Sequence, residues 1–268
     1  SSSPDPSSPA VILFTSGTEG DPKGVVLSHR NIVANVHQIL AHVPEALKLD
    51  DILFSPLPTF HCFGLTAGAL LPLLGGMRSV LHPSPLQTKL IPKRVEETGA
   101  TFLFATDTFL NQYIRACTGN ELGNLRYAVC GAERVRDETR QLVRRRFNVE
   151  LLEGYGATEA APVISVNQPS HNHHGTVGRL LPGMEVMFEP VPGIEKGGRM
   201  LVRGANVMQG YLSPSKPGEL QLLPSGWHDT GDIVVQDEEG YLTVKGRLKR
   251  FAKIGGEMVS LAVAENCA

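Results

Sequence analysis

The sequence predicts an α/β fold in which a mostly parallel sheet, flanked by helices, is joined to a small antiparallel β-barrel subdomain. Over residues 10–160, short apolar runs alternate with longer amphipathic runs, a pattern that favours parallel strands with helices packed on the sheet faces. From about Gly175 onward the apolar runs are short, partly alternating and separated by turn residues, which is typical of antiparallel strands. The 268 residues suffice for one large domain or two modest ones.

Each predicted element rests on one such run. The strands predicted in the first part cover residues 10–14, 52–54, 78–81, 101–104, 127–130 and 150–152. The helices predicted between them cover residues 28–43, 64–74, 89–98, 106–116 and 136–147, and the side chain of Ser28 can cap the first. The strands predicted in the second part cover residues 184–190, 199–203, 219–222, 232–236 and 241–245, with a hairpin-type connection at 237–240.

The two ends of the chain differ from the parts between them. Residues 1–9 are rich in serine and proline and lack periodicity, so we interpret them as a linker. The predicted α/β subdomain then covers 10–174, and the barrel-like subdomain covers 175–245. Residues 246–268 resemble a hinge followed by the beginning of another domain, so we expect the chain to be a piece of a longer protein.

The composition excludes several classes of function. A formal net charge of −2 gives no general case for binding nucleic acid or a membrane surface. The longest apolar stretch, residues 65–77, contains glycine and proline and is shorter than the roughly 20 residues that a membrane-spanning helix needs. The four cysteines are far apart and form no C-x-x-C pair, which disfavours disulfides and zinc and indicates a reducing compartment.

A loop of glycines and hydroxyls with one lysine follows the first predicted strand. Its glycines let the backbone approach an anion closely, and its hydroxyls and ammonium group can donate hydrogen bonds to phosphate. The residues concerned are Thr15, Ser16, Gly17, Thr18, Gly20, Lys23 and Gly24. The loop is not a Walker loop, because Gly24 and Val25 follow the lysine where that motif has Ser or Thr. Taken alone, it is more typical of a flexible surface turn.

The loops after the other strands are the next place to search, because ligands of parallel sheets bind at the carboxyl ends of the strands. In the sequence GYGATE, Tyr155 can stack on a base, Thr158 can contact phosphate, and Glu159 can bind Mg²⁺. A turn with a capping Thr–Glu pair explains Thr158 and Glu159 but leaves the two glycines around Tyr155 unexplained.

Four weaker stretches complete the set, and each has a plain structural alternative. His61 follows the second strand in PLPTFHCFG and is a candidate gate of a pocket, although a packed histidine in a proline-kinked loop is favoured there. The small residues of CGAE, 130–133, leave room for a flat ring or form an ordinary turn. In WHDTGD, Asp232 can accept hydrogen bonds from both ribose hydroxyls or belong to a turn. Residues 246–257 form a basic hinge or a solvated basic loop.

Together and in this order, these stretches resemble the signature of the adenylate-forming superfamily of acyl-CoA synthetases, luciferases and peptide-synthetase adenylation domains. The resemblance covers about residues 10–265. Within the superfamily the chain looks most similar to the acyl–acyl-carrier-protein synthetases that form one half of bacterial bifunctional 2-acylglycerophosphoethanolamine acyltransferases. Residues 151–156, 175–184, 191–195 and 249–260 carry this closer resemblance.

The resemblance implies a role for each matching residue. It implies that Thr15, Ser16, Gly17, Thr18, Gly20 and Lys23 hold the β- and γ-phosphates of ATP. It implies an adenine site at Gly131, Ala132, Glu133, Tyr155 and Gly156, an α-phosphate contact at Thr158, an Mg²⁺ ligand at Glu159 and a ribose site at Asp232 and Arg247. The catalytic residues would be Lys23, Thr158 and Glu159, with His61 and Phe63 at the acyl pocket and Lys249 at the hinge of a C-terminal lid.

The implied reaction joins a fatty acid to a thiol in two steps, with ATP and Mg²⁺ as cofactors. The acid first becomes acyl-AMP, and the pantetheine thiol of acyl carrier protein then takes the acyl group, in a pathway that recycles phospholipid acyl chains. Lysophospholipid would bind an acyltransferase half outside this chain. We expect that the longer protein associates with the cytoplasmic face of the inner membrane, that this piece is soluble, and that it binds no nucleic acid.

One departure from the superfamily pattern limits these expectations. Its members carry an essential lysine near the end of the lid, and this chain has no matching residue. We therefore expect the chain alone to be inactive or weakly active. The alternatives are an acyl-CoA ligase and a module that binds ATP or AMP without ligation. A P-loop NTPase is disfavoured, because the Walker Ser/Thr is absent.

Two charged clusters remain outside this scheme. The predicted helix 136–147 carries Arg136, Arg140 and Arg144 on one face, which is a candidate docking face for the acidic acyl carrier protein. A solvated helix face is the favoured alternative. His171, His173 and His174 are a conceivable metal site, but with no cysteine or carboxylate close by in sequence a polar loop is favoured.

Overall fold

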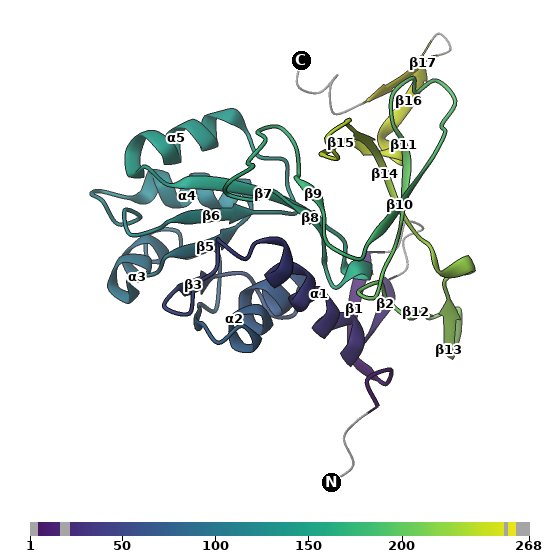
Figure 1. Ribbon diagram of the computed structural model, residues 1–268, viewed down its shortest axis with the longest axis horizontal. Coiled ribbons are helices and arrows are strands. Elements are labelled where there is room, and N and C mark those ends of the chain that lie inside the picture. The colour runs from purple at the N-terminus through teal and green to yellow at the C-terminus, as the bar shows by residue number, and fades with distance from the viewer. Residues whose placement is uncertain (1–4, 17–21, 255–256, 261–268) are drawn as a thin grey trace.

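The computed structural model describes residues 5–16, 22–254 and 257–260. Its centre is a seven-stranded sheet with the strand order β4-β3-β5-β6-β7-β8-β9 (Figure 1). The first five of these strands run parallel, and the last two are antiparallel. The strands are β3 (Ile52–Ser55), β4 (Arg78–Leu81), β5 (Phe102–Ala105), β6 (Tyr127–Cys130), β7 (Glu150–Gly156), β8 (Val163–Val166) and β9 (Arg179–Leu180).

Helices cover both faces of this sheet, because its strands are apolar on both sides. Phe102 and Phe104 of β5 pack into one core cluster, whereas Leu103 and Ala105, which point to the opposite face, pack into another. The first cluster includes residues of α1 (His29–His42), the π-helical segment η1 (Gly64–Leu70) and α2 (Leu71–Leu74). The second includes residues of α3 (Ile91–Thr98), α4 (Asp107–Ala116) and α5 (Asp137–Phe147).

Two four-stranded antiparallel sheets lie beside the central sheet (Figure 1). One has the order β1-β2-β12-β13 and contains β1 (Pro9–Ser16), β2 (Pro22–Ser28), β12 (Gly210–Ser213) and β13 (Lys216–Leu222). The other has the order β10-β11-β14-β15 and contains β10 (Glu185–Glu189), β11 (Gly198–Arg203), β14 (His228–Gln236) and β15 (Leu242–Arg247). A further hairpin, β16 (Phe251–Ile254) with β17 (Glu257–Ser260), follows. Short 3₁₀ turns occur at η2 (Thr158–Ala160), η3 (Pro224–Gly226) and η4 (Leu248–Arg250).

The predicted fold class is confirmed, except for the closed barrel. The central sheet is mostly parallel and is flanked by helices, as predicted. The predicted barrel is wrong, since the second part of the chain forms open antiparallel sheets within the described residues. The hairpin at residues 237–240 does join the antiparallel pair β14 and β15.

The first strand also differs from its prediction as a buried strand. Ile12 and Phe14 are 46% and 75% exposed, whereas Leu13 between them is 8% exposed. This alternation arises because β1 is the edge strand of an antiparallel sheet with one covered face. The helix start at Ser28 is confirmed: the Ser28 hydroxyl accepts from Asn31 N, and the Asn31 side chain accepts from Ser28 N.

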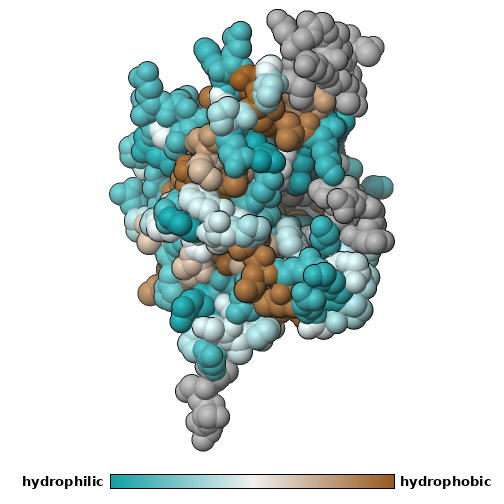
Figure 2. Space-filling view, turned by 90° about the vertical axis from the view of Figure 1, so that its right-hand side faces the viewer, coloured by the Kyte–Doolittle hydropathy of each residue, from teal (hydrophilic) through white to brown (hydrophobic). Residues whose placement is uncertain are grey.

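The predicted division of the chain at residue 174 remains a proposal. Two of the sheets contain strands from both sides of that boundary, since β9 joins the central sheet and β12 pairs with β2. No helix within the described residues is both long and apolar enough to cross a membrane. On the face shown in Figure 2, hydrophobic residues form separate areas among hydrophilic ones.

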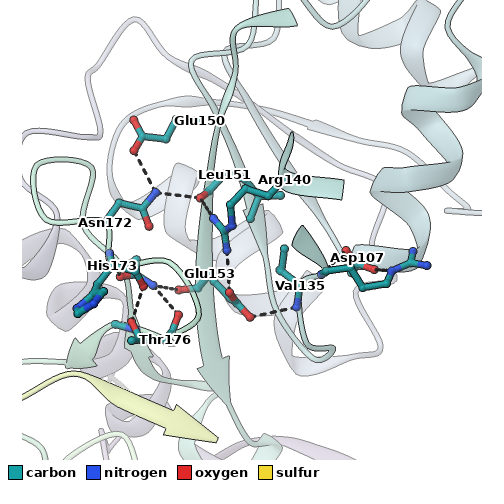
Figure 3. A network of polar contacts seen from close by, with 12 residues as sticks. Asp107, Val135, Arg140, Glu150, Leu151, Glu153, Asn172, His173 and Thr176 are labelled. Atoms are coloured by element: carbon teal, nitrogen blue, oxygen red, sulfur yellow. Dashed lines mark hydrogen bonds and ion pairs between the residues drawn. The ribbon is translucent and has the colours of Figure 1, made fainter. Parts of the chain in front are cut away.

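Arg136, at the N-cap of α5, and Arg140 and Arg144 within it do not form the uniform free face that both the docking hypothesis and the favoured solvated-face alternative assumed. Arg140 is 8% exposed, and its guanidinium donates to Glu153 Oε2 at 2.9 Å and to Leu151 O at 3.0 Å (Figure 3). Arg136 forms an ion pair with the buried carboxylate of Asp107 at 2.5 Å. Only Arg144 of the three is exposed without a carboxylate partner within the described residues. Arg140 therefore holds α5 against β7 and is not available for docking.

We predict that Arg140→Ala lowers the free energy of unfolding by about 3–5 kcal/mol, because it leaves the Glu153 carboxylate buried without its cation. Urea denaturation monitored by circular dichroism measures this. Arg144→Ala on the same helix is the matched control and should change stability by less than about 0.5 kcal/mol. Equal effects of the two substitutions would contradict the structural role of Arg140.

Candidate active site

A cavity of about 840 Å³ opens where the carboxyl ends of β6 and β7 meet strands β12 and β14. This is the edge of a parallel sheet at which ligands bind. The predicted site residues that line it come from five separate stretches of the chain. They are Thr15, Lys23, His61, Phe63, Gly131, Ala132, Tyr155, Gly156, Thr158, Glu159, Arg247 and Lys249. The fold thus brings most of the predicted site residues together. The individual role of each residue stays a prediction.

Six predicted site residues, Asp232 among them, are not among the described residues that line the cavity. Gly17, Thr18 and Gly20 lie outside the described residues, and Ser16 is the last residue of β1. The Glu133 carboxylate has a partner within the protein: its Oε2 accepts a hydrogen bond of 2.9 Å from the backbone N of Thr108, at the start of α4. Its role as a cofactor-binding residue stays a prediction.

Asp232, the predicted ribose residue, lies behind two residues that line the cavity. The Tyr155 hydroxyl donates to its Oδ2 at 2.5 Å, and Arg247 Nε lies 3.0 Å from its Oδ1. Burial raises the pKa of Asp232, and these two partners oppose that shift. Burial and the adjacent carboxylate raise the pKa of Tyr155 well above its usual value, so the phenol remains a donor. Asp232 thus fixes both Tyr155 and Arg247 at the cavity wall.

Glu159, the predicted Mg²⁺ ligand, is held by three groups. Its Oε1 accepts a hydrogen bond of 2.7 Å from the Tyr211 hydroxyl, and its Oε2 lies 4.0 Å from His228 Nε2. Its backbone oxygen accepts from Met208 N at 2.7 Å. Burial lowers the pKa of His228, which favours the neutral imidazole. The ammonium of Lys23 lies 5.6 Å from the centre of the Tyr211 ring. Lys23, from the predicted phosphate loop, thus lies next to the tyrosine that binds Glu159.

Thr158 contacts the loop that carries His61. Its hydroxyl lies 3.3 Å from Cys62 Sγ, and burial raises the pKa of that thiol. Burial also lowers the pKa of His61, whose Nδ1 accepts from Phe63 N at 3.3 Å. The Thr158 hydroxyl thus lies at the cavity wall against the thiol of Cys62.

The glycines around Tyr155 have a steric reason. A Cβ on Gly156 would lie 2.3 Å from the backbone oxygen of Pro162, so only glycine fits at that point of β7. A Cβ on Gly131 would lie 3.2 Å from Phe63, at the side of the cavity where a flat ring was predicted. Because glycines occupy these two positions, the backbone packs closely against its neighbours and no side chain projects from this wall.

The cavity is polar in one part and apolar in another. Its apolar lining comes from α1, η1, α2, β5 and β8, on the face of the central sheet that carries the first core cluster. These residues are Ile39, Phe63, Ala67, Leu71, Phe104, Val163 and Val166. The arrangement suits a ligand with a charged head and a hydrocarbon tail.

The described residues contain no group of three or more His, Cys, Asp or Glu side chains that can hold a metal ion alone. Mg²⁺ is commonly held by one or two carboxylates together with substrate phosphates. Glu159 at the cavity wall, beside Lys23 and Thr158, fits this mode of binding. His171, His173 and His174 form no metal group, and the ring of His173 packs edge-on against Tyr241 instead.

Comparisons with known proteins identify the family of the chain. The profile of the family described as "AMP-binding enzyme" matches residues 1–212. The chain belongs to the AMP-binding enzyme family. A long-chain-fatty-acid–CoA ligase of Yersinia pestis is 32% identical over 259 residues, which are 92% of this chain and 45% of that protein. A medium-chain fatty-acid–CoA ligase of Escherichia coli is 31% identical over 267 residues, 96% of this chain and 46% of that protein.

Solved structures of AMP-binding enzymes share the fold. O-succinylbenzoate coenzyme A synthetase of Bacillus subtilis, in complex with AMP, aligns with a TM-score of 0.83 at 25% identity, over 98% of this chain and 54% of that chain. The same enzyme was solved with ATP and a magnesium ion, at a TM-score of 0.81, 24% identity and 96% and 54% coverage. The chain therefore spans about half the length of the relatives it matches.

The sequence did not single out several residues that line this cavity. Tyr211 and Cys62 line the cavity, and His228 does so within a stretch noted only for Asp232. Tyr211 lies on β12, which the sequence did not predict as a strand. No local pattern in the sequence points to Tyr211, because its place at the cavity comes from the pairing of β12 with the distant strand β2.

We predict that Tyr155→Phe lowers the free energy of unfolding by about 1–3 kcal/mol at pH 7, because it removes a donor from the buried Asp232 carboxylate. The pKa of Asp232 is already raised, and losing this donor raises it further. The variant therefore takes up the Asp232 proton at a higher pH than the wild type, and its stability deficit shrinks as the pH falls toward that range.

Urea unfolding of both proteins across pH 4–8 measures this dependence. Tyr241→Phe is the matched control, since the Tyr241 hydroxyl donates to a neutral acceptor, His171 O, at 3.2 Å. Its cost should not depend on the Asp232 titration. A deficit of Tyr155→Phe that is the same at every pH would contradict the assignment.

Proposed function

We propose that this chain carries the nucleotide and acyl site of an ATP-dependent acid–thiol ligase that activates a fatty acid as its acyl-adenylate. The observation that carries the proposal is the single cavity with a polar wall at Lys23, Thr158, Glu159 and Arg247 and an apolar wall on the central sheet. An acyl-AMP has the same division between a charged head and a hydrocarbon tail. Membership of the AMP-binding enzyme family supports the nucleotide part.

The polar wall suits the first half-reaction. A carboxylate oxygen attacks the α-phosphorus of ATP, the bond to the bridging oxygen breaks, and pyrophosphate leaves. Negative charge accumulates around phosphorus, so the site must supply positive charge and hydrogen-bond donors there. The Thr158 hydroxyl and the Lys23 ammonium supply them, and Tyr155 and Arg247 orient the nucleoside. Mg²⁺ bound at Glu159 would neutralise further phosphate charge.

The thiol that takes the acyl group is the open part of the proposal. The stretches that resemble acyl–acyl-carrier-protein synthetases favour the pantetheine thiol of acyl carrier protein as the acceptor. The product would then be used in phospholipid acyl-chain recycling. The relatives named as CoA ligases favour coenzyme A instead. Both acceptors end in the same pantetheine arm, so the cavity residues do not distinguish them. Measuring thioester formation by the full-length protein with each acceptor in turn distinguishes acyl carrier protein from coenzyme A.

We predict that the chain binds a non-reactive long-chain acyl-AMP mimic, an acyl-sulfamoyl adenosine, and that Thr158→Ala weakens this binding by about tenfold or more. The Thr158 hydroxyl would lose a hydrogen bond to a charged group, worth about 1.5–3 kcal/mol. Isothermal titration calorimetry measures both affinities. Thr108→Ala, at an exposed threonine outside the cavity, is the control. A cooperatively folded chain that shows no binding would reject the proposed site.

The apolar wall gives a second prediction. Ala67 is 3% exposed and lines the cavity from η1, so Ala67→Leu should fill space that a long acyl chain needs. Each methylene kept from the apolar wall costs about 0.8 kcal/mol. We expect a sixteen-carbon mimic to lose affinity by at least tenfold and a four-carbon mimic to be little affected. Equal losses for both chain lengths would place the acyl tail elsewhere.

A further inference from the structure

Tyr211 contacts two groups of the proposed site that lie far apart in the sequence. Its hydroxyl donates to Glu159 Oε1 at 2.7 Å, and its ring lies 5.6 Å from the Lys23 ammonium. We propose that Tyr211 is a positioning residue that orients the metal-binding carboxylate of Glu159 and the phosphate-binding ammonium of Lys23. The inference rests on the proposed function and adds to it a residue that acts through its neighbours.

The strand pairing places Tyr211 at this point. In the antiparallel pair of β12 and β2, Tyr211 lies opposite Val25. Lys23, two residues before Val25, therefore shares a sheet face with Tyr211 as its diagonal neighbour, within reach of an aromatic ring. An aromatic face attracts an ammonium group at this distance. The Tyr211 ring thus helps to fix the position of the Lys23 ammonium, at the end of the predicted phosphate loop.

The hydroxyl fixes the direction of the carboxylate. The Tyr211 hydroxyl is the donor in this contact, because a carboxylate oxygen accepts, and its oxygen lies 2.7 Å from Glu159 Oε1. The backbone of Glu159 is held to the same segment of the chain, because Met208 N donates to its carbonyl oxygen at 2.7 Å. Oε1 accepts from the phenol, whereas Oε2 has His228 Nε2 at 4.0 Å, beyond hydrogen-bond distance, so Oε2 is the oxygen better placed for a cation.

Such partners matter for metal ligands in general. Groups that hydrogen-bond a ligating carboxylate set its orientation, and their loss lowers metal affinity or activity by about 10–100-fold. Mg²⁺ demands near-ideal geometry and takes few protein ligands, so one well-oriented carboxylate carries much of the protein's contribution. Tyr211 is therefore placed to control how strongly Mg²⁺ promotes ATP binding.

The experiment is a calorimetric titration of the chain with ATP, once with Mg²⁺ and once in EDTA. We expect Tyr211→Phe to lose about tenfold or more in affinity with Mg²⁺ and nothing in EDTA, because the ring over Lys23 is kept. Tyr211→Leu should also lose about twofold to fivefold in EDTA, since the ring is gone. Tyr113→Phe is the control, because its hydroxyl donates to Pro85 O outside the cavity at 2.8 Å.

A double-mutant cycle tests whether the hydroxyl acts through Glu159. In a Glu159→Gln background, Tyr211→Phe should cause no further loss of Mg²⁺-dependent affinity. Equal losses with and without Mg²⁺, or no loss at all, would overturn the inference and leave the proposed function intact. A folded wild-type chain that binds ATP under neither condition would reject the proposed function and this inference with it.

Discussion

The pairing of β2 with β12 is the constraint on which the candidate site depends. It joins residues that are about 185 positions apart in the chain, with Gly210 opposite Val26 and Tyr211 opposite Val25. Closing so long a loop costs conformational entropy, which must be repaid by the buried valines and leucine of β2 and by the core cluster that includes Met208. Without this pairing, the strand of Lys23 would have no fixed relation to Glu159, and the cavity would lose one wall.

Buried carboxylates around the site are each held by more than one partner. Glu153 accepts from Arg140 and from Val135 N, and Asp232 from Tyr155 and Arg247. An unpaired buried charge is costly, whereas a fully satisfied network is rigid. The carboxylates therefore hold α5 against β7, and β7 against β14 and β15, so the cavity wall formed by these three strands has a defined shape before any ligand binds.

The parallel part of the fold was predictable from the sequence because its strands are apolar on both faces and its helices are long. β4 and β6 match their predicted bounds, and β3 and β5 differ by one residue. β2 and β12 were missed, because their short runs gain stability only from a partner distant in the sequence. The same reason hid Tyr211. The burial of Arg140 was not predicted, because sequence spacing does not show that its partner is Glu153.

In the proposed ligase, the choice between acyl carrier protein and coenzyme A would be made outside the cavity, because the reacting end of both is pantetheine. Three arginines of α5 are already used within this chain: Arg136 binds Asp107, Arg140 binds Glu153, and Arg146 donates to Ile114 O and Cys117 O. Any carrier-protein contact on this helix would therefore have to use its exposed outer side, at Arg144 and Arg145. A row of exposed charge is common on solvated helices, so α5 by itself gives no preference for a carrier protein over coenzyme A.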